Sequence, residues 1–215
     1  ARFPLLDEAG APRLDAATGL PEALLVWTTT PWTLTSNVAA AVGPQLIYVK
    51  VRQDDQIYYL SRGALKRVLP GKVEVLGELP GSAMLGWRYR GPFDELPVVQ
   101  EAFAEKNYSH RVIAWNEVGD EEGVGIVHIA PGCGAEDFAL SKELDLPVIG
   151  PLDGDGVYKA GFGWLSGNGV QGVTARILDD LRAKGLLYRL EDYTHRYPVC
   201  WRCGTDGGPR ARACW

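Results

Sequence analysis

The amino-acid sequence predicts a mainly β protein with peripheral helices (α+β), in which the strands form a distorted closed β-barrel. Three observations predict this fold class: short apolar stretches typical of strands recur along the chain, Gly and Pro residues separate them, and only two stretches have a clear helical pattern. With 215 residues, of which 46% are hydrophobic and 23% charged, the chain can bury a sizeable core. We expect one domain over residues 1–199 and a short appendage over residues 200–215.

Strand patterns dominate the first two thirds of the chain. LIYVKV from Leu46 and IYYLS from Ile57 are separated by a polar turn, and VEVLGEL from Val73 adds another short β segment. Further on, HRVIAWNEV from His110 and GVGIVHIA from Gly123 flank an acidic turn, so we expect a second hairpin there.

Helices are predicted at three places. The clearest covers residues 170–184, followed by Gly185 at the position of a C-terminal cap. Its apolar face consists of Val173, Ile177, Leu178 and Leu181. A shorter helix is expected over residues 135–144, and a brief one over residues 64–69, where Pro70 and Gly71 end it.

The overall charge argues against a protein that holds nucleic acid on a broad basic face. The net charge is −5 and the pI is near 5.3, whereas phosphate binding depends on Lys and Arg. Any such contact must be local, and residues 182–215, with seven Lys or Arg against three Asp or Glu, are the best candidate. No apolar run has transmembrane length and no leader precedes the chain, so we expect a cytoplasmic piece of a larger protein, without a membrane partner and with reduced thiols.

The segment from Trp27 to Asn37, WTTTPWTLTSN, concentrates hydroxyl groups at one turn. One interpretation is structural: threonine favours strands, and the apolar run from Ala23 ends where Pro31 blocks further pairing. Along such a strand, Thr28 and Thr30 would point one way and Thr29 the other. The other interpretation is functional, because Pro31 can open a helical turn that brings Thr33 beside the same hollow.

A second unusual segment, GVGIVHIAPGCGAEDF, begins at Gly123. An apolar strand leads to His128, a Gly and Pro turn follows, and a helix begins at Glu136 and Asp137. His128 is also compatible with a core histidine, and Asp137 with an acid that stabilises a helix N-terminus. Together with the threonine turn, the two residues supply an imidazole and a carboxylate, which suffice to bind a cationic amine and hydrolyse an ester.

The pair of segments resembles the two signature segments of the isoleucyl-tRNA synthetase editing (CP1) domain, in the class I aminoacyl-tRNA synthetase family. The valyl and leucyl relatives share the architecture, but their first segment usually reads TTRP and histidine is usually absent at the position of His128. The resemblance covers nearly all of residues 24–203. An editing domain of a valyl- or leucyl-tRNA synthetase is the related alternative.

The resemblance implies a β-barrel-like insertion in a larger synthetase that hydrolyses valine wrongly attached to tRNA(Ile), and that can also dispose of valyl-adenylate. The nucleotide-binding sequences HIGH and KMSKS of the parent enzyme are absent here. The expected partners are the acceptor end of tRNA(Ile) carrying valine and the remainder of the synthetase. Editing is needed because a pocket for isoleucine cannot strongly reject valine, and this synthetase is itself the known example, with roughly 150-fold discrimination.

The resemblance also assigns roles to individual residues. It implies catalytic roles for Thr28, Thr30 and Asp137, the last of which also binds the α-ammonium group. It implies substrate-binding roles for Thr29, Trp32, Thr33, Asn37 and His128. The resemblance implies that activated water attacks the ester, so neither a covalent nucleophile nor a cofactor is expected for editing.

Three positions depart from the family pattern: Thr35 stands where proline is common, Val124 replaces a threonine and Cys133 a histidine. Cys133 lies five residues from His128 and four from Asp137, so a thiol nucleophile with a base is a rival mechanism. A rival of another class is a non-catalytic tRNA-docking module in which the threonines and the acid are structural.

Cys200 and Cys203 form a CxxC pair with zinc spacing, but a structural site needs about four ligands and no second pair exists. The resemblance implies that the partnering pair precedes this insertion in the parent enzyme. We therefore expect no metal in the editing site, half of a parental zinc site at Cys200 and Cys203, and a disordered tail after them.

Overall fold

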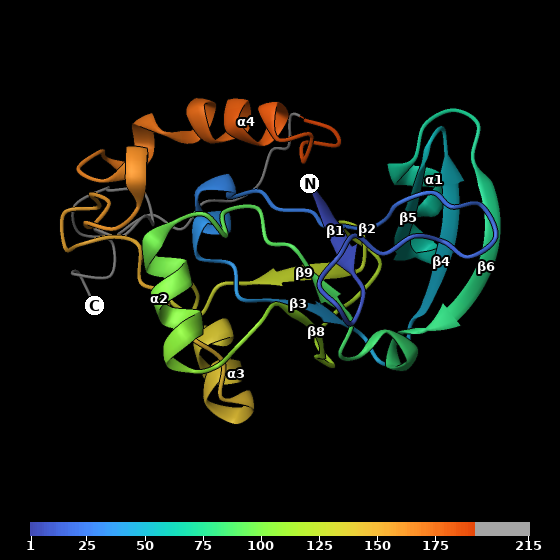
Figure 1. Cartoon of the computed structure of the whole chain (residues 1–215), viewed down its shortest axis with the longest axis horizontal. Helices are drawn as coiled ribbons and strands as arrows, with labels where there is room; N and C mark the ends of the chain where they lie inside the picture. The colour runs from blue at the N-terminus through green and yellow to red at the C-terminus, as the bar shows by residue number, and fades with distance from the viewer. Residues whose placement is uncertain (192–215) are drawn as a thin grey trace.

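The structure, a computed structural model, describes residues 1–191 and contains one continuous nine-stranded mixed sheet (Figure 1). The strand order is β6-β4-β5-β2-β1-β7-β8-β3-β9. Their bounds are β1 Arg2–Leu6, β2 Glu22–Leu25, β3 Ala39–Val42, β4 Ile47–Gln53, β5 Gln56–Ser61, β6 Glu74–Pro80, β7 Arg88–Tyr89, β8 Arg111–Ala114 and β9 Ile126–Ile129.

The helices lie at the periphery, as the sequence predicted. Figure 1 shows α1 beside β4 to β6, α2 and α3 at the opposite end of the molecule, and α4 along a third side. Their bounds are α1 Leu65–Val68, α2 Pro97–Glu105, α3 Ala135–Leu144 and α4 Thr174–Ala183. Short 3₁₀ helices occur as well, and the one that matters for the site is η1, Pro31–Ser36.

Most predicted elements are confirmed. β4 and β5 pair as an antiparallel hairpin, β6 joins the other side of β4, and α3 has the predicted bounds. α4 is preceded by a 3₁₀ turn, buries Ile177 and Leu181, and is followed by Gly185 at a φ of 69°. Since a positive φ suits glycine, this residue ends the helix as expected.

The predicted hairpin of β8 and β9 is wrong. Both strands pair with β3, which lies between them, parallel to β8 and antiparallel to β9. β3 has the sequence AAAV and is fully buried, with none of its residues exposed to solvent. A strand buried on both faces has no alternation of polar and apolar residues, so the pattern that identifies half-buried strands does not appear.

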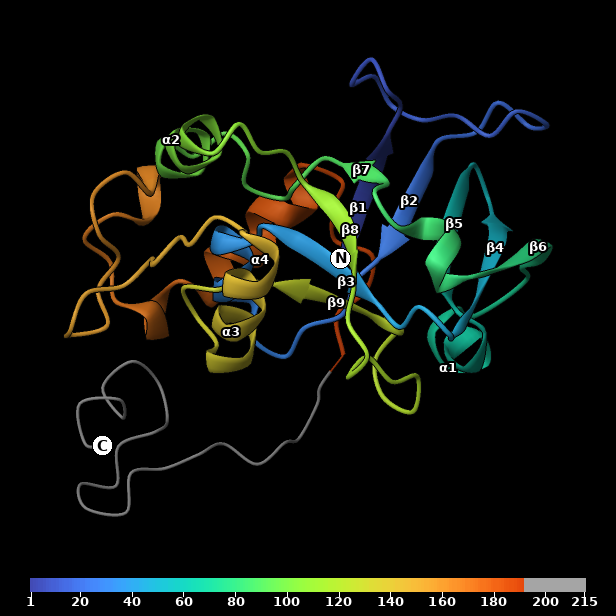
Figure 2. The same ribbon diagram turned by 90° about the horizontal axis from the view of Figure 1, so that it is seen from below.

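Closure of the sheet is not confirmed. Among the described residues the ladder begins at β6 and ends at β9, and these two strands do not pair with each other. β1 connects two parts, because it pairs with β2 on one side and with β7 on the other. Figure 2 shows β4, β5 and β6 set apart from the strands around β3. The sheet is therefore curved and open.

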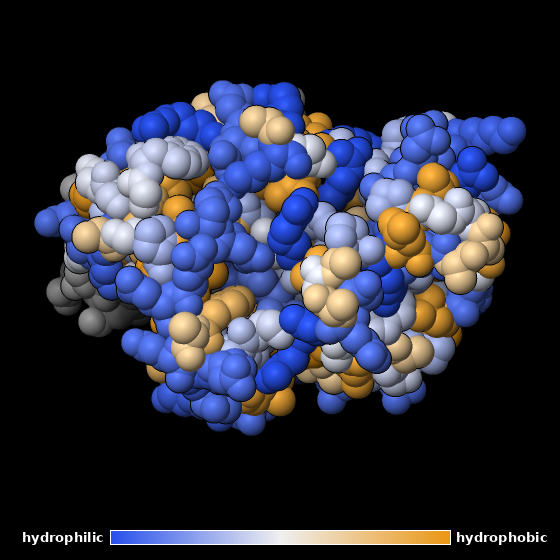
Figure 3. All heavy atoms as spheres, viewed as in Figure 1, coloured by the Kyte–Doolittle hydropathy of each residue, from blue (hydrophilic) through white to orange (hydrophobic). Residues whose placement is uncertain are grey.

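Two further findings concern the part of the chain that the structure describes. None of the helices in residues 1–191 has the length and apolarity needed to span a membrane. In the view of Figure 3, hydrophilic residues cover most of the surface and hydrophobic ones are scattered among them. The CxxC pair of Cys200 and Cys203 and the tail after it lie outside the described residues, so their zinc and disorder predictions remain untested.

Candidate active site

The threonine turn is an irregular segment between two ordered elements. β2 ends at Leu25, Trp27 forms an isolated parallel bridge with Val127, and η1 begins at Pro31. The structural interpretation, in which the strand continues through Thr30, is therefore wrong. Pro31 at the start of η1 confirms the predicted helical turn. The Trp27 bridge sets the turn directly beside β9.

Hydrogen bonds within the turn fix its threonines. The Thr30 N–H donates to Thr28 Oγ1 at 3.0 Å, and the Oγ1 atoms of Thr29 and Thr30 are 3.3 Å apart. Thr33 Oγ1 donates to the Thr30 carbonyl at 2.8 Å, and its other contact is His128 Nε2, at 2.9 Å. The last contact joins the two signature segments.

A cavity of about 310 Å³ lies between the threonine turn and β9. Its lining consists of Trp27, Thr28, Thr29 and residues 122–128. Three of the predicted site residues, Thr28, Thr29 and His128, therefore share one cavity. Gly123 has a φ of 60°, and a Cβ on it would lie 2.9 Å from the Trp27 ring, so this wall requires glycine both for its backbone and for its packing.

His128 is a half-buried residue of β9, whose backbone pairs with Ala40 of β3. Burial lowers its pKa from 6.5 to about 4, because charging an imidazole away from water is unfavourable. The ring is therefore neutral near pH 7. Its Nδ1 atom is buried and has no hydrogen-bond partner.

Asp137 lies in the first turn of α3 and is half-buried. Its Oδ2 accepts a hydrogen bond from the Ala130 N–H at 2.7 Å, which ties the start of α3 to the end of β9. Burial raises the pKa of this carboxyl, while the Ala130 N–H acts in the opposite direction. Asp137 does not line the cavity of about 310 Å³, so its contact with a ligand would require the ligand to extend beyond this space.

Other predicted residues have supporting positions. Thr30 and Thr33 organise the turn, and the Trp32 carbonyl accepts hydrogen bonds from Thr35 and from Tyr158. Asn37 is 3% exposed, donates to the Ala39 carbonyl and accepts from the Tyr89 hydroxyl. Both polar atoms of Asn37 thus have partners inside the protein, and its substrate-binding role stays a prediction.

Cys133 lies in the turn before α3, where its N–H donates to the Ala130 carbonyl at 2.8 Å. The sulfur is close enough to Tyr158 to help raise the pKa of that phenol to about 12, after the larger effect of burial. Cys133 does not line the cavity that contains His128. Within residues 1–191, no group of three or more His, Cys, Asp or Glu side chains could hold a metal ion.

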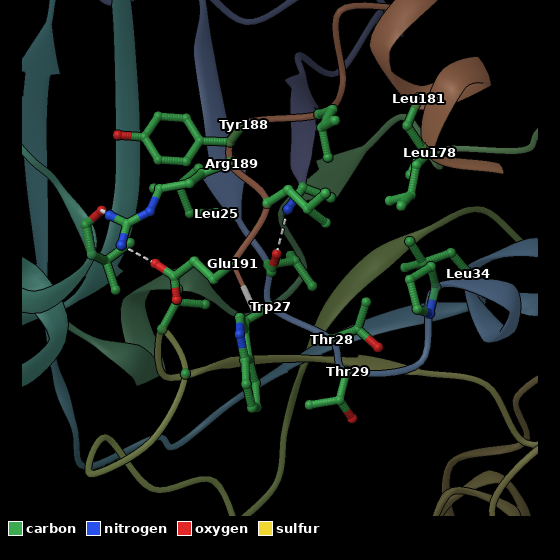
Figure 4. A pocket seen from close by; sticks show the side chains of 18 of the residues that line it. Leu25, Trp27, Thr28, Thr29, Leu34, Leu178, Leu181, Tyr188, Arg189 and Glu191 are labelled. Carbon is green, nitrogen blue, oxygen red and sulfur yellow. Dashed lines mark hydrogen bonds and ion pairs between the residues drawn. The ribbon is translucent and has the colours of Figure 1, made fainter. Parts of the chain in front are cut away.

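A larger hollow of about 510 Å³ continues from the other side of the threonine turn (Figure 4). Leu25, Leu34, Leu178 and Leu181 give it an apolar wall, and Trp27, Thr28 and Thr29 are common to both hollows. The described cations at its rim are already paired: Arg67 donates to the carbonyls of Asp120 and Gly123, and Arg189 to Val68 and Glu191. These contacts leave a mainly apolar surface.

Sequence reasoning missed two contributors to the walls. Trp27 begins the first segment, and it lines both hollows because its backbone bridge to Val127 places it beside β9. Glu122 belongs to the acidic turn that was interpreted only as a hairpin connection, and it also lines both hollows. No local sequence pattern indicates either role, because long-range packing creates both.

Comparisons with known proteins agree with the resemblance seen in the sequence. No family model matches the chain. An isoleucine–tRNA ligase of Methanothermobacter marburgensis is 43% identical over 85% of the chain, and one of Methanopyrus kandleri is 40% identical over 99%. The alignments cover 17% and 20% of those two proteins, so the chain spans about a fifth of the length of the curated relatives.

The fold has a counterpart among solved structures. The crystal structure of GlLeuRS-CP1, a leucyl-tRNA synthetase CP1 domain, matches with a TM-score of 0.67 and 13% sequence identity. The match covers 89% of this chain and 98% of that one. The fold is therefore that of a CP1 domain of an aminoacyl-tRNA synthetase. The chain belongs to the isoleucyl-tRNA synthetase family, and it corresponds to about a fifth of the length of those enzymes.

Proposed function

We propose that this domain hydrolyses the ester bond of valine attached to tRNA(Ile), and that it can also remove valine from valyl-adenylate. The observation that carries the proposal is the shared cavity, in which two threonine hydroxyls of the turn and the imidazole of His128 form the walls of a space of about 310 Å³. The family relationship supplies the substrate class.

The threonine hydroxyls are suited to positioning water and stabilising an oxyanion. Thr28 Oγ1 accepts the Thr30 N–H, so its direction is fixed while its own proton stays available for donation. A donor that is already oriented needs little reorganisation when negative charge develops on the ester oxygen. Direct attack of a bound water on the ester forms no acyl-enzyme. The threonine hydroxyls and the neutral imidazole that line the cavity are suited to such a reaction.

Asp137 is the proposed acceptor for the α-ammonium group of valine. A carboxylate can accept more than one hydrogen bond, so the bond from Ala130 does not exhaust it. Burial raises the pKa of this carboxyl, and a bound ammonium group would favour its charged form. A charge-assisted contact of this kind contributes about 1.5 to 3 kcal/mol.

Valine release by the purified chain tests the proposal. The chain, at high concentration, is mixed with tRNA(Ile) carrying labelled valine, and free valine is measured against spontaneous hydrolysis. We expect release above the spontaneous rate, whereas binding of the tRNA without release of valine would indicate a docking module. Simultaneous substitution of Thr28 and Thr29 by valine provides the matched control, because it removes the hydroxyls of the cavity with little change in side-chain volume.

A further inference from the structure

Thr33 stands between two groups that compete for one proton. Its Oγ1 is 2.8 Å from the Thr30 carbonyl and 2.9 Å from His128 Nε2. A hydroxyl has one proton to donate and two lone pairs to accept with. A carbonyl can only accept, so the direction of the Thr33 proton determines which nitrogen of His128 carries the ring proton.

Two arrangements of the protons are available to the neutral ring. In the first, Thr33 donates to the Thr30 carbonyl and His128 Nε2–H donates to Thr33, which leaves Nδ1 as a bare acceptor. In the second, Thr33 donates to Nε2, and the ring proton resides on Nδ1. Because Nδ1 is buried without a partner, the second arrangement creates a buried, unpaired N–H donor.

The first arrangement is the more favourable. Buried unpaired N–H groups are rarer in proteins than acceptors with unused lone pairs. It also keeps the bond from the Thr33 hydroxyl to the Thr30 carbonyl, which the second arrangement gives up. Both the imidazole and the threonine turn therefore gain from the Nε2–H form.

We propose that Thr33 is a positioning residue that fixes His128 as the Nε2–H tautomer and in one ring orientation, and so makes the imidazole an immobile wall of the cavity. The substrate-binding role implied for Thr33 by the family resemblance is thereby replaced by an action through His128, since Thr33 is buried and does not line the cavity. The inference deepens the proposed function: a fixed ring meets the additional methylene of isoleucine, whereas a ring that turns can yield to it.

Three features of the structure around His128 support this proposal. The strand that carries it is held by pairing with β3, so that ring rotation is the main remaining freedom. The lowered pKa keeps the ring neutral near pH 7, which is the condition under which a tautomer can be selected. The Thr33 backbone N–H also donates to the Thr30 carbonyl, at 3.1 Å, so the hydroxyl that contacts the ring is itself anchored.

Nitrogen NMR of the chain labelled at its three histidines tests the tautomer directly, because a protonated and a bare ring nitrogen have well-separated chemical shifts. The His128 signals are assigned from their loss in His128→Gln. We expect the wild type and Thr33→Ser to have the proton on Nε2, and Thr33→Val, which has no acceptor there, to populate the Nδ1–H form as well. An unchanged Nε2–H signal in Thr33→Val would overturn the proposal.

Thr35 provides a matched control within the same 3₁₀ helix. Its Oγ1 donates to the Trp32 carbonyl at 2.8 Å, the same three-residue step that Thr33 makes to Thr30, and Thr35 is likewise buried. Thr35→Val therefore removes an equivalent hydroxyl bond from η1 without removing the partner of His128. We expect it to retain the wild-type tautomer, and a shift as large as in Thr33→Val would overturn the specific role of Thr33.

Ester selectivity provides the second readout, and it rests on the proposed function. The ratio of kcat/KM for valyl-tRNA(Ile) over isoleucyl-tRNA(Ile) should fall about fivefold in Thr33→Val and stay at the wild-type value in Thr33→Ser. Equal losses for both esters, with an unchanged ratio, would mean that Thr33 only supports the fold and would overturn the proposal. If the wild type releases no valine, the proposed function fails, while the NMR result still decides whether Thr33 fixes the ring.

Discussion

At the residue scale, the shape and the charge of the Asp137 carboxylate have separate proposed roles. One carboxylate oxygen holds the Ala130 N–H, and the charge of the group is the feature proposed to act on the substrate. An amide oxygen can hold the same N–H, so shape and charge can be separated by a single substitution.

Asp137→Asn should lower valine release about 10- to 100-fold with little loss of folding, because it removes the charge-assisted contact and keeps the bond to Ala130. Single-turnover deacylation and thermal unfolding, measured on the same preparation, check this. Glu136→Gln is the control: it makes the same charge change at an exposed neighbour and should leave the rate near wild type. A wild-type rate of valine release by Asp137→Asn would mean that Asp137 only stabilises the start of α3 and does not bind the substrate.

Cys133 separates the water mechanism from the thiol mechanism. Cys133→Ser should leave valine release largely intact, because the proposed reaction uses water and the threonine hydroxyls. The measurement is the deacylation rate, together with mass spectrometry of the wild type quenched during turnover. Loss of activity in the variant, with an acyl group trapped on the wild-type thiol, would favour the thiol mechanism.

The lowered pKa of His128 has a consequence for stability. The folded state binds this proton near pH 4 and the unfolded state near pH 6.5, so the unfolded chain holds more protons between these values. The free energy of unfolding should therefore fall as pH drops through this window, by about 1 to 3 kcal/mol from this residue, and its contribution should be constant above the window. Urea unfolding at pH 7 and pH 4.5 should show a smaller decrease for His128→Gln than for wild type. Equal decreases would contradict the assignment.

At the element scale, the turn between β9 and α3 determines where Asp137 lies. Gly132 is in this turn, and a Cβ on it would approach the Ile149 carbonyl oxygen to 1.9 Å. Since the obstacle is backbone, it cannot rotate away as a flexible side chain would. The close approach therefore couples the position of α3 to the segment that precedes residue 150.

Gly132→Ala should lower the free energy of unfolding by about 1 to 3 kcal/mol and reduce valine release, because the turn must move to admit the methyl group. Urea unfolding and deacylation rates measure the two effects. Gly154→Ala is the control, since a Cβ there meets nothing within 4 Å and the residue is exposed. Equal stability of the two variants would show that the turn adapts at no cost.

The elements differ in how far the sequence reveals them. β4, β5 and β6 were predictable because their short apolar stretches and the turns between them are local signals, and α3 because a Gly and Pro turn precedes it and two acids occupy its first turn. β3 was not, since four small or branched residues buried on both faces carry no period. Missing β3 also produced the wrong hairpin of β8 and β9, because the strand between them was unknown.

The same distinction holds for the site. Thr28, Thr29 and His128 belong to compact motifs, and the structure gives them one cavity. Trp27 and Glu122 lie 95 residues apart in the chain, and only the packing around the Trp27 bridge brings them to common walls. Asn37 shows what a motif alone does not reveal: this polar residue is buried and makes internal hydrogen bonds to Ala39 and Tyr89.

At the scale of the whole molecule, the site lies where the two parts of the sheet meet. The threonine turn follows β2 on one side of β1, whereas β9 is the final strand on the other side. The isolated bridge from Trp27 to Val127 links the threonine turn to β9, so the cavity depends on both parts of the sheet. With a net charge of −5, the chain should hold tRNA weakly and more weakly as salt rises, which requires assays at high protein concentration and low ionic strength.

Deacylation of valyl-tRNA(Ile) and isoleucyl-tRNA(Ile) by the wild type and by His128→Ala, under identical conditions, tests the central claim of a size-selective editing site most directly. The wild type should release valine and spare isoleucine, because the additional methylene meets the imidazole. His128→Ala should release isoleucine about 5- to 150-fold faster than wild type, the range expected when an overpacking cost of about 1 to 3 kcal/mol is relieved, while retaining activity on valine. A variant that spares isoleucyl-tRNA(Ile) as faithfully as the wild type would contradict the account and move the size limit to the threonine turn or to Trp32.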